Sequence, residues 1–328
     1  MILAGDTGGT NTRLALFEKT ENGFESVAIE KFSSPAFGGL NEIIEKFLTD
    51  KPHKIERACF AVPGPVRENK AKLANLPWAV DAEEVKKQFG YDRIGLINDL
   101  ESNAYGLNEL EGSDFAVLNE GTPNPSGNAA LISAGTGLGE AGMHFADGRR
   151  LPFASEGGHA DFAPRTEIEI DLLRYLLGKY ERVSVERVVS GMGLQNIYEF
   201  LRDTKREEVP TWLADEIADS KDVGAMVSKH GLACKAPICE QTLEIFVSLY
   251  GAQAGNLGLT MLATGGVYIG GGIAPKILSK LQEPTFFKSF KSKGRMSDLM
   301  ERMPVSVVLN DNAALLGAAH FAFYEIKE

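Results

Sequence analysis

Residues 2–17 read ILAGDTGGTNTRLALF, and residues 130–145 read ALISAGTGLGEAGMHF. In each stretch a turn of glycine and threonine separates two apolar runs, which is typical of two strands joined by a tight connection. The Gly-Gly pair in the first stretch favours an antiparallel pairing of its strands. Because the same pattern occurs twice, we expect one structural unit to be used twice in the fold.

Strands and helices alternate along the rest of the N-terminal third. Apolar, β-branched runs at 24–32, 57–62 and 93–99 predict further strands, and the apolar stripe of 38–48 predicts an amphipathic helix between them. This alternation favours parallel additions to the sheet that the first two strands begin, so we expect a mixed-sheet α/β protein. A length of 328 residues is sufficient for two domains.

A second block follows the polar stretch at 119–128, which is rich in proline, asparagine and glycine, and we place the domain crossing near it. The elements expected in this block are helices at 167–180 and 240–263, strands in 267–276 and 305–311, and a last apolar helix in 312–324. The helix at 240–263 is too apolar to lie on a protein surface.

Composition excludes several classes of function. A net charge of −11 argues against a nucleic-acid-binding surface, and the three cysteines lack the spacing of a zinc site or disulfide framework. The N-terminus lacks a signal-peptide pattern, and no apolar stretch reaches the ~18 residues needed to span a bilayer. We therefore expect a cytoplasmic protein without membrane partners.

The acidic net charge also limits how phosphate could be bound. Since an acidic protein repels anions, phosphate would have to be bound by backbone N–H groups, helix N-termini or Mg²⁺.

Several familiar phosphate-binding motifs are absent from the sequence. There is no GxxxxGK[ST] segment and no HRD or DFG set, which excludes a P-loop and a protein-kinase site. Gly137, Gly139 and Gly142 match GxGxxG, but a dinucleotide site needs a helix after that motif. Here Asp147-Gly148 between two apolar runs predicts a hairpin instead.

The two glycine turns are the first candidate binding sites. The residues of the first turn are Gly5, Asp6, Thr7, Gly8, Gly9, Thr10 and Asn11, and those of the second are Gly135, Thr136 and Gly137. Small residues let backbone N–H groups approach phosphate oxygens, and Asp6 is suited to hold Mg²⁺ through water. Ordinary hairpin turns are the alternative, but two such turns on two domains are suited to flank one polyphosphate.

Asn98 and Asp99 follow a buried strand at the end where α/β sheets place ligands. A carboxylate at that place can accept a proton from a hydroxyl group. The alternative is structural, because Asn and Asp also cap helices, here one expected to start at Glu101.

Three further segments carry candidate side chains or open turns. Glu156 and His159 flank a glycine pair, which predicts a loop able to wrap a polyol, although a plain surface turn is the alternative. Glu186 lies in a charged amphipathic stretch, where a glutamate is usually solvated. Gly271 and Gly272 end a strand with a turn bare enough for a base or ribose, or for close helix packing.

Eight segments together resemble the bacterial ATP-dependent glucokinases of the hexokinase type, in order and across nearly the whole chain. They are AGDTGGTNTRLALF (4–17), VPGPV (62–66), NLPW (75–78), LINDLESNAYGL (96–107), SAGTGLGEAGM (133–143), SEGGHADFAPR (155–165), SVERVVSG (184–191) and GGVYIGGGIAPK (265–276). The zinc pattern CxCGxxGCxE of the related ROK family is absent. This counts against a ROK-type enzyme or repressor.

The resemblance implies a two-domain actin-like ATPase and sugar-kinase (ribonuclease H-like) fold with mixed central sheets and an interdomain cleft. Its small α/β domain would hold residues 1–112 and 305–328, and its large α/β domain residues 113–304. The implied substrates are glucose and ATP, with Mg²⁺ bridging the β- and γ-phosphates, and the implied assembly is a homodimer. A kinase for another hexose and a sugar-binding regulator that lost catalysis are the alternatives.

The resemblance also implies roles for individual residues. Asn98, Asp99, Glu156, His159 and Glu186 would hold the sugar hydroxyls, with Asp99 as the general base at the 6-hydroxyl and Asn75 as a further contact. The two glycine turns would cradle the phosphates, and Gly271-Gly272 would lie under the adenosine. No side chain of an adenine pocket can be identified from the sequence.

Overall fold

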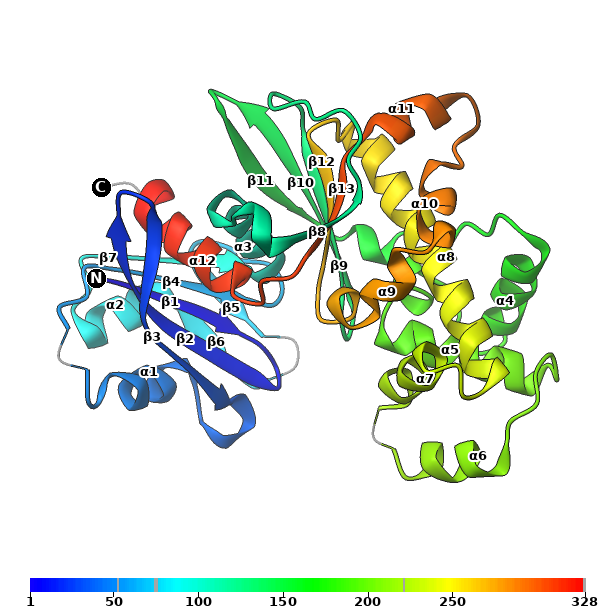
Figure 1. Ribbon diagram of the computed structural model, residues 1–328. Helices are drawn as coiled ribbons and strands as arrows, with labels where there is room; N and C mark the ends of the chain where they lie inside the picture. The colour runs from blue at the N-terminus through cyan, green and yellow to red at the C-terminus, as the bar shows by residue number, and fades with distance from the viewer. Residues whose placement is uncertain (52, 74–75, 221, 327–328) are drawn as a thin grey trace. The chain divides into compact units, whose positions relative to one another are not determined.

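The computed structural model describes residues 1–51, 53–73, 76–220 and 222–326 (Figure 1). The chain forms two compact units. The first contains Met1–Asp114, Leu151–Ala154 and Asn310–Glu328, and the second contains Phe115–Arg150 and Ser155–Leu309.

The first unit is built on a five-stranded sheet of order β3-β2-β1-β4-β7. Its strands are β1 (Ile2–Thr7), β2 (Asn11–Thr20), β3 (Gly23–Ser33), β4 (Arg57–Val62) and β7 (Arg93–Asn98). β1 pairs antiparallel with β2 and parallel with β4, and β4 pairs parallel with β7. The expected mixed sheet is therefore confirmed. A separate two-stranded sheet joins β5 (Lys70–Lys72) and β6 (Ala79–Asp81).

Successive residues of a strand point to opposite faces of the sheet, so apolar strands present apolar side chains on both faces. Helices cover both faces. The helices are α1 (Leu40–Leu48), α2 (Ala82–Phe89), α3 (Asp99–Gly106) and α12 (Ala313–His320). Leu3 packs in one core with residues of α1 and α2, whereas its neighbour Ala4 packs in another with residues of α12. In Figure 1, α1 and α2 lie on one side of the sheet and α12 on the other. Glycines let α3 and α12 approach closely, since a Cβ on Gly317 would lie 1.7 Å from the Ser102 carbonyl oxygen.

The second unit repeats the strand pattern of the first in a six-stranded sheet of order β11-β10-β9-β12-β13-β8. The strands of this sheet are β8 (Phe115–Asn119), β9 (Ala129–Ala134), β10 (Leu138–Ala146), β11 (Arg149–Ser155), β12 (Gly266–Gly270) and β13 (Val305–Val308). Of β11, only the end residues group with the second unit, since Leu151–Ala154 group with the first. β9 pairs antiparallel with β10 and parallel with β12, as β1 does with β2 and β4. The unit expected twice from the sequence is thus present twice.

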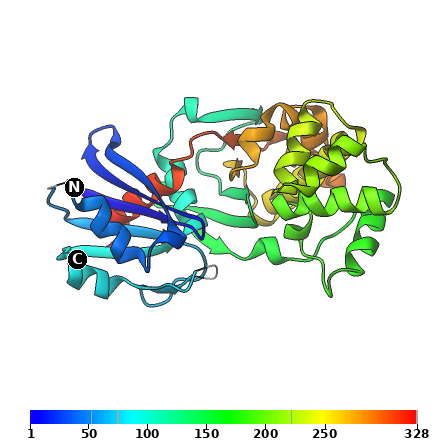
Figure 2. The same cartoon turned by 90° about the horizontal axis from the view of Figure 1, so that it is seen from below.

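The helices of the second unit are α4 (Glu167–Leu177), α5 (Gly191–Asp203), α6 (Thr211–Ala218), α7 (Val223–Leu232), α8 (Pro237–Met261), α9 (Leu278–Leu281), α10 (Pro284–Lys291) and α11 (Ser297–Arg302). Of these, α5, α7, α10 and α11 pack against α8, and α4 packs against α5 (Figures 1 and 2). α8 has 25 residues and is buried along most of its length, which confirms that it is no surface helix. Gly251 and Gly255 let the backbone of α10 approach it, because a Cβ on either would lie within 2.3 Å of a carbonyl oxygen there.

Several boundaries differ from the expectations. The helix expected at 167–180 ends at Leu177, and the helix expected from Glu101 begins at Asp99. Residues 305–308 were expected in the small domain, but they form β13, which pairs with β12 and β8, so the first unit resumes only at Asn310.

Two exclusions made from the sequence can be compared with the structure. The expected hairpin at Asp147-Gly148 is confirmed, with φ of 51° and 79°, so the GxGxxG segment runs along β10 into a turn and not into a helix. Among the helices that the structure describes, none combines the length and the apolar character of a membrane span.

Candidate active-site residues

Asp6 ends the first strand and is held by an arginine on the neighbouring strand. Arg13 stands directly opposite Asp6 in the β1–β2 register. Its Nη2 and Nε donate to Asp6 Oδ2 at 3.0 and 3.3 Å, and Nη2 also donates to the Asp311 carbonyl oxygen at 2.6 Å. Asp6 therefore faces a fixed cation, and the pair joins the first glycine turn to the segment that precedes α12.

The rest of the first turn is held by backbone bonds. Gly8 donates its N–H to the Asn11 carbonyl oxygen at 2.8 Å, and the Ser34 hydroxyl donates to the Gly8 carbonyl oxygen at 2.7 Å. Thr7 is buried, and within the described part of the chain its hydroxyl has no hydrogen-bond partner. Gly5 is buried too, and a Cβ there would lie 2.4 Å from the Phe60 ring, so packing alone explains that glycine.

Asn98 and Asp99 stand where β7 passes into α3. Asn98 Oδ1 accepts the N–H groups of Leu100 and Glu101 at 3.0 and 3.2 Å, and its Nδ2 donates to the Gly64 carbonyl oxygen at 3.2 Å. Asn98 is thus the helix cap, and it ties the VPGPV segment to the helix start. Asp99 occupies the first helical position, and its Oδ1 accepts the Leu100 N–H at 2.9 Å. Burial raises the pKa of Glu101 in the same turn.

Glu156 and His159 lie in one short turn of the second unit. The 3₁₀ turn Gly157–His159 sets the His159 Nε2 atom 3.9 Å from Glu156 Oε2, with both side chains more than half exposed. Arg182 fixes the turn from outside, since its Nη1 donates to the His159 carbonyl oxygen at 2.8 Å and to Asp161 Oδ1 at 2.7 Å. The two side chains therefore face solvent from a supported backbone.

Glu186 is not the solvated surface glutamate that its charged sequence context suggested. Its Oε2 accepts the Leu138 N–H at 2.9 Å. A Cβ on Gly137 would lie 2.5 Å from the same oxygen, so the glycine makes room for the carboxylate. The structure thereby joins a predicted sugar ligand to the second glycine turn.

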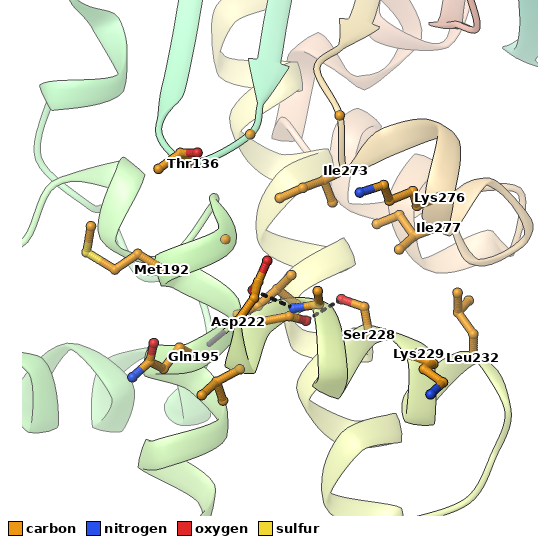
Figure 3. A pocket seen from close by; sticks show the side chains of 17 residues that line it. Thr136, Met192, Gln195, Asp222, Ser228, Lys229, Leu232, Ile273, Lys276 and Ile277 are labelled. Atoms are coloured by element: carbon orange, nitrogen blue, oxygen red, sulfur yellow. Dashed lines mark hydrogen bonds between the residues drawn. The ribbon is translucent and has the colours of Figure 1, made fainter. Parts of the chain in front are cut away.

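A cavity of about 870 Å³ opens beside that turn, within the second unit (Figure 3). It is lined by Gly135, Thr136, Gly191, Met192, Leu194, Gln195, Asp222, Val223, Gly224, Ala225, Ser228, Lys229, Leu232, Gly272, Ile273, Lys276 and Ile277. The first residues of α5 and α7 thus face the cavity, and helix N-termini attract anions. Lys229 and Lys276 add positive charge in an otherwise acidic protein.

The structure separates the predicted glycines by their surroundings. Gly272 lines the cavity. Gly271 has φ of +84°, and a Cβ on it would lie 2.3 Å from the Ala134 carbonyl oxygen, so its place in the turn is structural. Asn75 lies outside the described residues. The lining residues Gln195, Asp222 and Lys276 were missed, although helix-capping signals at Ser190 and Asp222 mark both helix starts in the sequence.

Comparison with known proteins assigns the family. A family model described as Glucokinase matches residues 3–324. The chain is 44% identical over 333 residues to a glucokinase of Nostoc punctiforme, an alignment that covers 97% of this chain and 98% of that protein. The chain belongs to the glucokinase family.

Solved structures agree with this assignment. The crystal structure of a glucokinase from an Antarctic psychrotroph superimposes with a TM-score of 0.86 at 33% identity, covering 98% of each chain. A ROK family glucokinase from Streptomyces griseus gives a TM-score of 0.66 at 20% identity, covering 98% of this chain and 99% of that one, a likeness of fold alone. The expected actin-like ATPase and sugar-kinase fold is confirmed, and so is assignment to the family distinct from ROK.

Proposed function

We propose that this chain transfers the γ-phosphoryl group of ATP to the 6-hydroxyl of glucose, with Asp99 as the general base. The activity itself, phosphorylation of glucose with ATP, follows from membership of the glucokinase family over residues 3–324. The observation that supports the base assignment is that the side chain before Asp99 already caps α3. Asn98 caps the helix through two N–H groups, so the Asp99 carboxylate is not required as the cap.

The position of Asp99 also suits a base. The positive end of the α3 dipole favours the ionised carboxylate, which is the form that accepts a proton. Phosphoryl transfer depends on positioning and charge neutralisation more than on covalent chemistry. A carboxylate that takes the proton of the sugar hydroxyl as it attacks the phosphorus is therefore sufficient, and no nucleophilic side chain is needed.

We assign sugar binding to Asn98 and Asp99 from the first unit and to Glu156, His159 and Glu186 from the second. Carboxylates accept hydrogen bonds from neighbouring hydroxyls, and imidazole can donate or accept. Glu186 is held by the Leu138 N–H, so its orientation is set before the sugar arrives. Preset polar groups of this kind discriminate well, since a sugar that fails to pair them leaves them desolvated.

ATP would occupy the cavity of the second unit. The bare Gly272 turn and the apolar Ile273 and Ile277 suit the adenosine, while the second glycine turn and the starts of α5 and α7 suit phosphate oxygens. Lys276 is suited to pair with a phosphate or a ribose hydroxyl. The first glycine turn would contribute to the same phosphates those backbone N–H groups that do not hold the turn itself, which excludes the Gly8 N–H.

Mg²⁺ fits this set of residues only as an ion carried by the nucleotide. Among the residues that the structure describes, no group of three or more His, Cys, Asp and Glu side chains is placed to hold a metal alone. Kinase Mg²⁺ keeps most of its waters and takes one or two carboxylates besides the phosphates, a demand that Asp6 can meet. The ion would neutralise charge on the phosphates, while Arg13 keeps the Asp6 carboxylate oriented.

An assay of ADP release with ATP and a panel of hexoses tests the proposal, combined with ³¹P NMR of the product. We expect glucose to be the preferred acceptor and the phosphate to be on carbon six. A preference for mannose, fructose or an amino sugar would contradict the sugar assignment, and binding without ADP release would indicate a regulator. The cytoplasmic location and the homodimer stay predictions.

A further inference from the structure

A buried glutamate lies directly beneath the turn that carries Glu156 and His159. Glu140 on β10 is only 4% exposed, and its Oε1 accepts the Gln253 Nε2–H of α8 at 2.7 Å. Its Oε2 lies against Gly157, because a Cβ on that residue would be 2.2 Å from it. Glutamate is rarely buried so deeply without a specific partner or role, and the phosphoryl-transfer step does not use this one.

Glu140 ends a chain of hydrogen bonds that starts at a lysine. Lys293 Nζ donates to Asn256 Oδ1 at 2.7 Å, and Asn256 Nδ2 donates to Gln253 Oε1 at 3.1 Å. Burial raises the pKa of Glu140 and lowers that of Lys293 to about 8. Each bond in such a chain polarises the next, so the chain fixes the rotamers of its members. The carboxyl group is therefore held in one place.

The turn above rests on β10 through both backbone and side chain. The Ser155 hydroxyl donates to the Glu140 carbonyl oxygen at 2.8 Å and accepts the Gly157 N–H at 3.2 Å. A Cβ on Gly158 would lie 2.1 Å from the Leu138 carbonyl oxygen. The two neighbouring glycines thus lie close to different parts of β10. Gly157 lies against the Glu140 side chain, and Gly158 lies against the Leu138 backbone.

We propose that Glu140 is a positioning residue for sugar binding. Its carboxyl group fills the space beside Gly157. It thereby sets the distance of the turn from β10, and with it the positions of Glu156 and His159. The inference rests on the proposed sugar-binding role of those two side chains. A role in stability alone would change the melting temperature without a selective effect on glucose.

A double-mutant cycle between Glu140 and Gly157 tests this role in the full-length protein. In Gly157→Ala the new methyl group collides with the carboxyl and displaces the turn, so we expect the KM for glucose to rise about tenfold or more. Glu140→Ala alone should raise it as well, because the turn loses its support. In the double variant the methyl group introduced by Gly157→Ala occupies the vacated space, and the KM should return to within about threefold of the parent.

Gly158→Ala is the matched control. Its methyl group would collide with the backbone oxygen of Leu138, which no side-chain truncation removes, so Glu140→Ala should not rescue it. Glu140→Gln keeps the acceptor for Gln253 and the shape of the side chain, and it should stay close to the parent. The KM for ATP and the melting temperature of each variant report whether the protein is folded.

The outcomes separate this inference from the proposed function. Glu156→Gln and His159→Ala should raise the KM for glucose, and if neither does, the sugar-site assignment itself is wrong. If they do, but Glu140→Ala leaves the KM for glucose unchanged or adds its effect to that of Gly157→Ala, then Glu140 does not position the turn. Loss of ATP affinity and of stability in step with glucose affinity would likewise overturn the inference.

Discussion

Replacing Asp99 and Asn98 one at a time separates catalysis from helix capping. Asp99→Asn keeps the shape of the side chain and an Oδ1 acceptor for the Leu100 N–H, but it removes the group that accepts the proton. A positioned general base contributes about 10²- to 10⁴-fold to the rate, which corresponds to about 3–5 kcal/mol of barrier. We therefore expect kcat to fall by at least a hundredfold, with folding stability and much of the glucose binding retained.

Asn98→Ala, unlike Asp99→Asn, should lower the folding stability. It removes the acceptor of the Leu100 and Glu101 N–H groups and the donor to the Gly64 carbonyl oxygen. Loss of a helix cap costs about 1 kcal/mol, and one further hydrogen bond contributes about 0.5–1.5 kcal/mol. The free energy of unfolding should thus fall by about 1.5–2.5 kcal/mol. Asn98→Asp is the control, because aspartate caps as well as asparagine.

The assay combines steady-state kinetics, glucose affinity by calorimetry and urea denaturation on each purified variant. The two variants should differ in kind: Asp99→Asn loses rate at unchanged stability, and Asn98→Ala loses stability together with glucose affinity. A kcat of Asp99→Asn within about tenfold of the parent would refute the base assignment. A loss of stability in Asp99→Asn as large as in Asn98→Ala would show that Asp99 also acts as the cap.

Three further expectations follow from the same geometry. If Glu156 and His159 bind hydroxyls, kcat/KM should be far higher for glucose than for fructose, and equal values would contradict their assignment. Gly271→Ala should lower the free energy of unfolding by about 1–3 kcal/mol, because its φ of +84° and the nearby backbone oxygen leave no place for a methyl group. Gly272→Ala enters open space, so it should preserve stability and raise the KM for ATP, and equal melting temperatures for the two variants would refute the distinction. Burial raises the pKa of Glu140 above its ordinary value of 4.5. Just above pH 4.5 the carboxyl group therefore stays protonated in the folded state, whereas it has lost its proton in the unfolded state. The parent should therefore lose stability relative to Glu140→Gln as pH rises from 4.5 through the raised pKa, and parallel pH profiles in thermal denaturation would exclude this.

The sequence alone determined the repeated strand-turn-strand unit and the family. A short apolar run bounded by a turn of glycine and threonine is a local feature of the sequence, so the strands at 2–17 and 130–145 could be predicted before any packing was known. The motifs are also local, because each consists of neighbouring residues. Asn98, Asp99, Glu156, His159 and Glu186 could thus be named as candidates through the family resemblance that these motifs carry.

Only the tertiary structure decided what these residues touch. The contact between Glu186 and the turn at Gly137, and the meeting of α5, α7 and Gly272 around one cavity, join segments far apart in the chain. No periodicity of the sequence encodes such contacts. Gly271 and Gly272 read alike in the sequence, yet one packs on a carbonyl oxygen and the other faces open space. Likewise, Glu140 reads as one more acidic residue in the sequence. The role that we propose for it depends on its burial beneath Gly157, which only the folded chain creates.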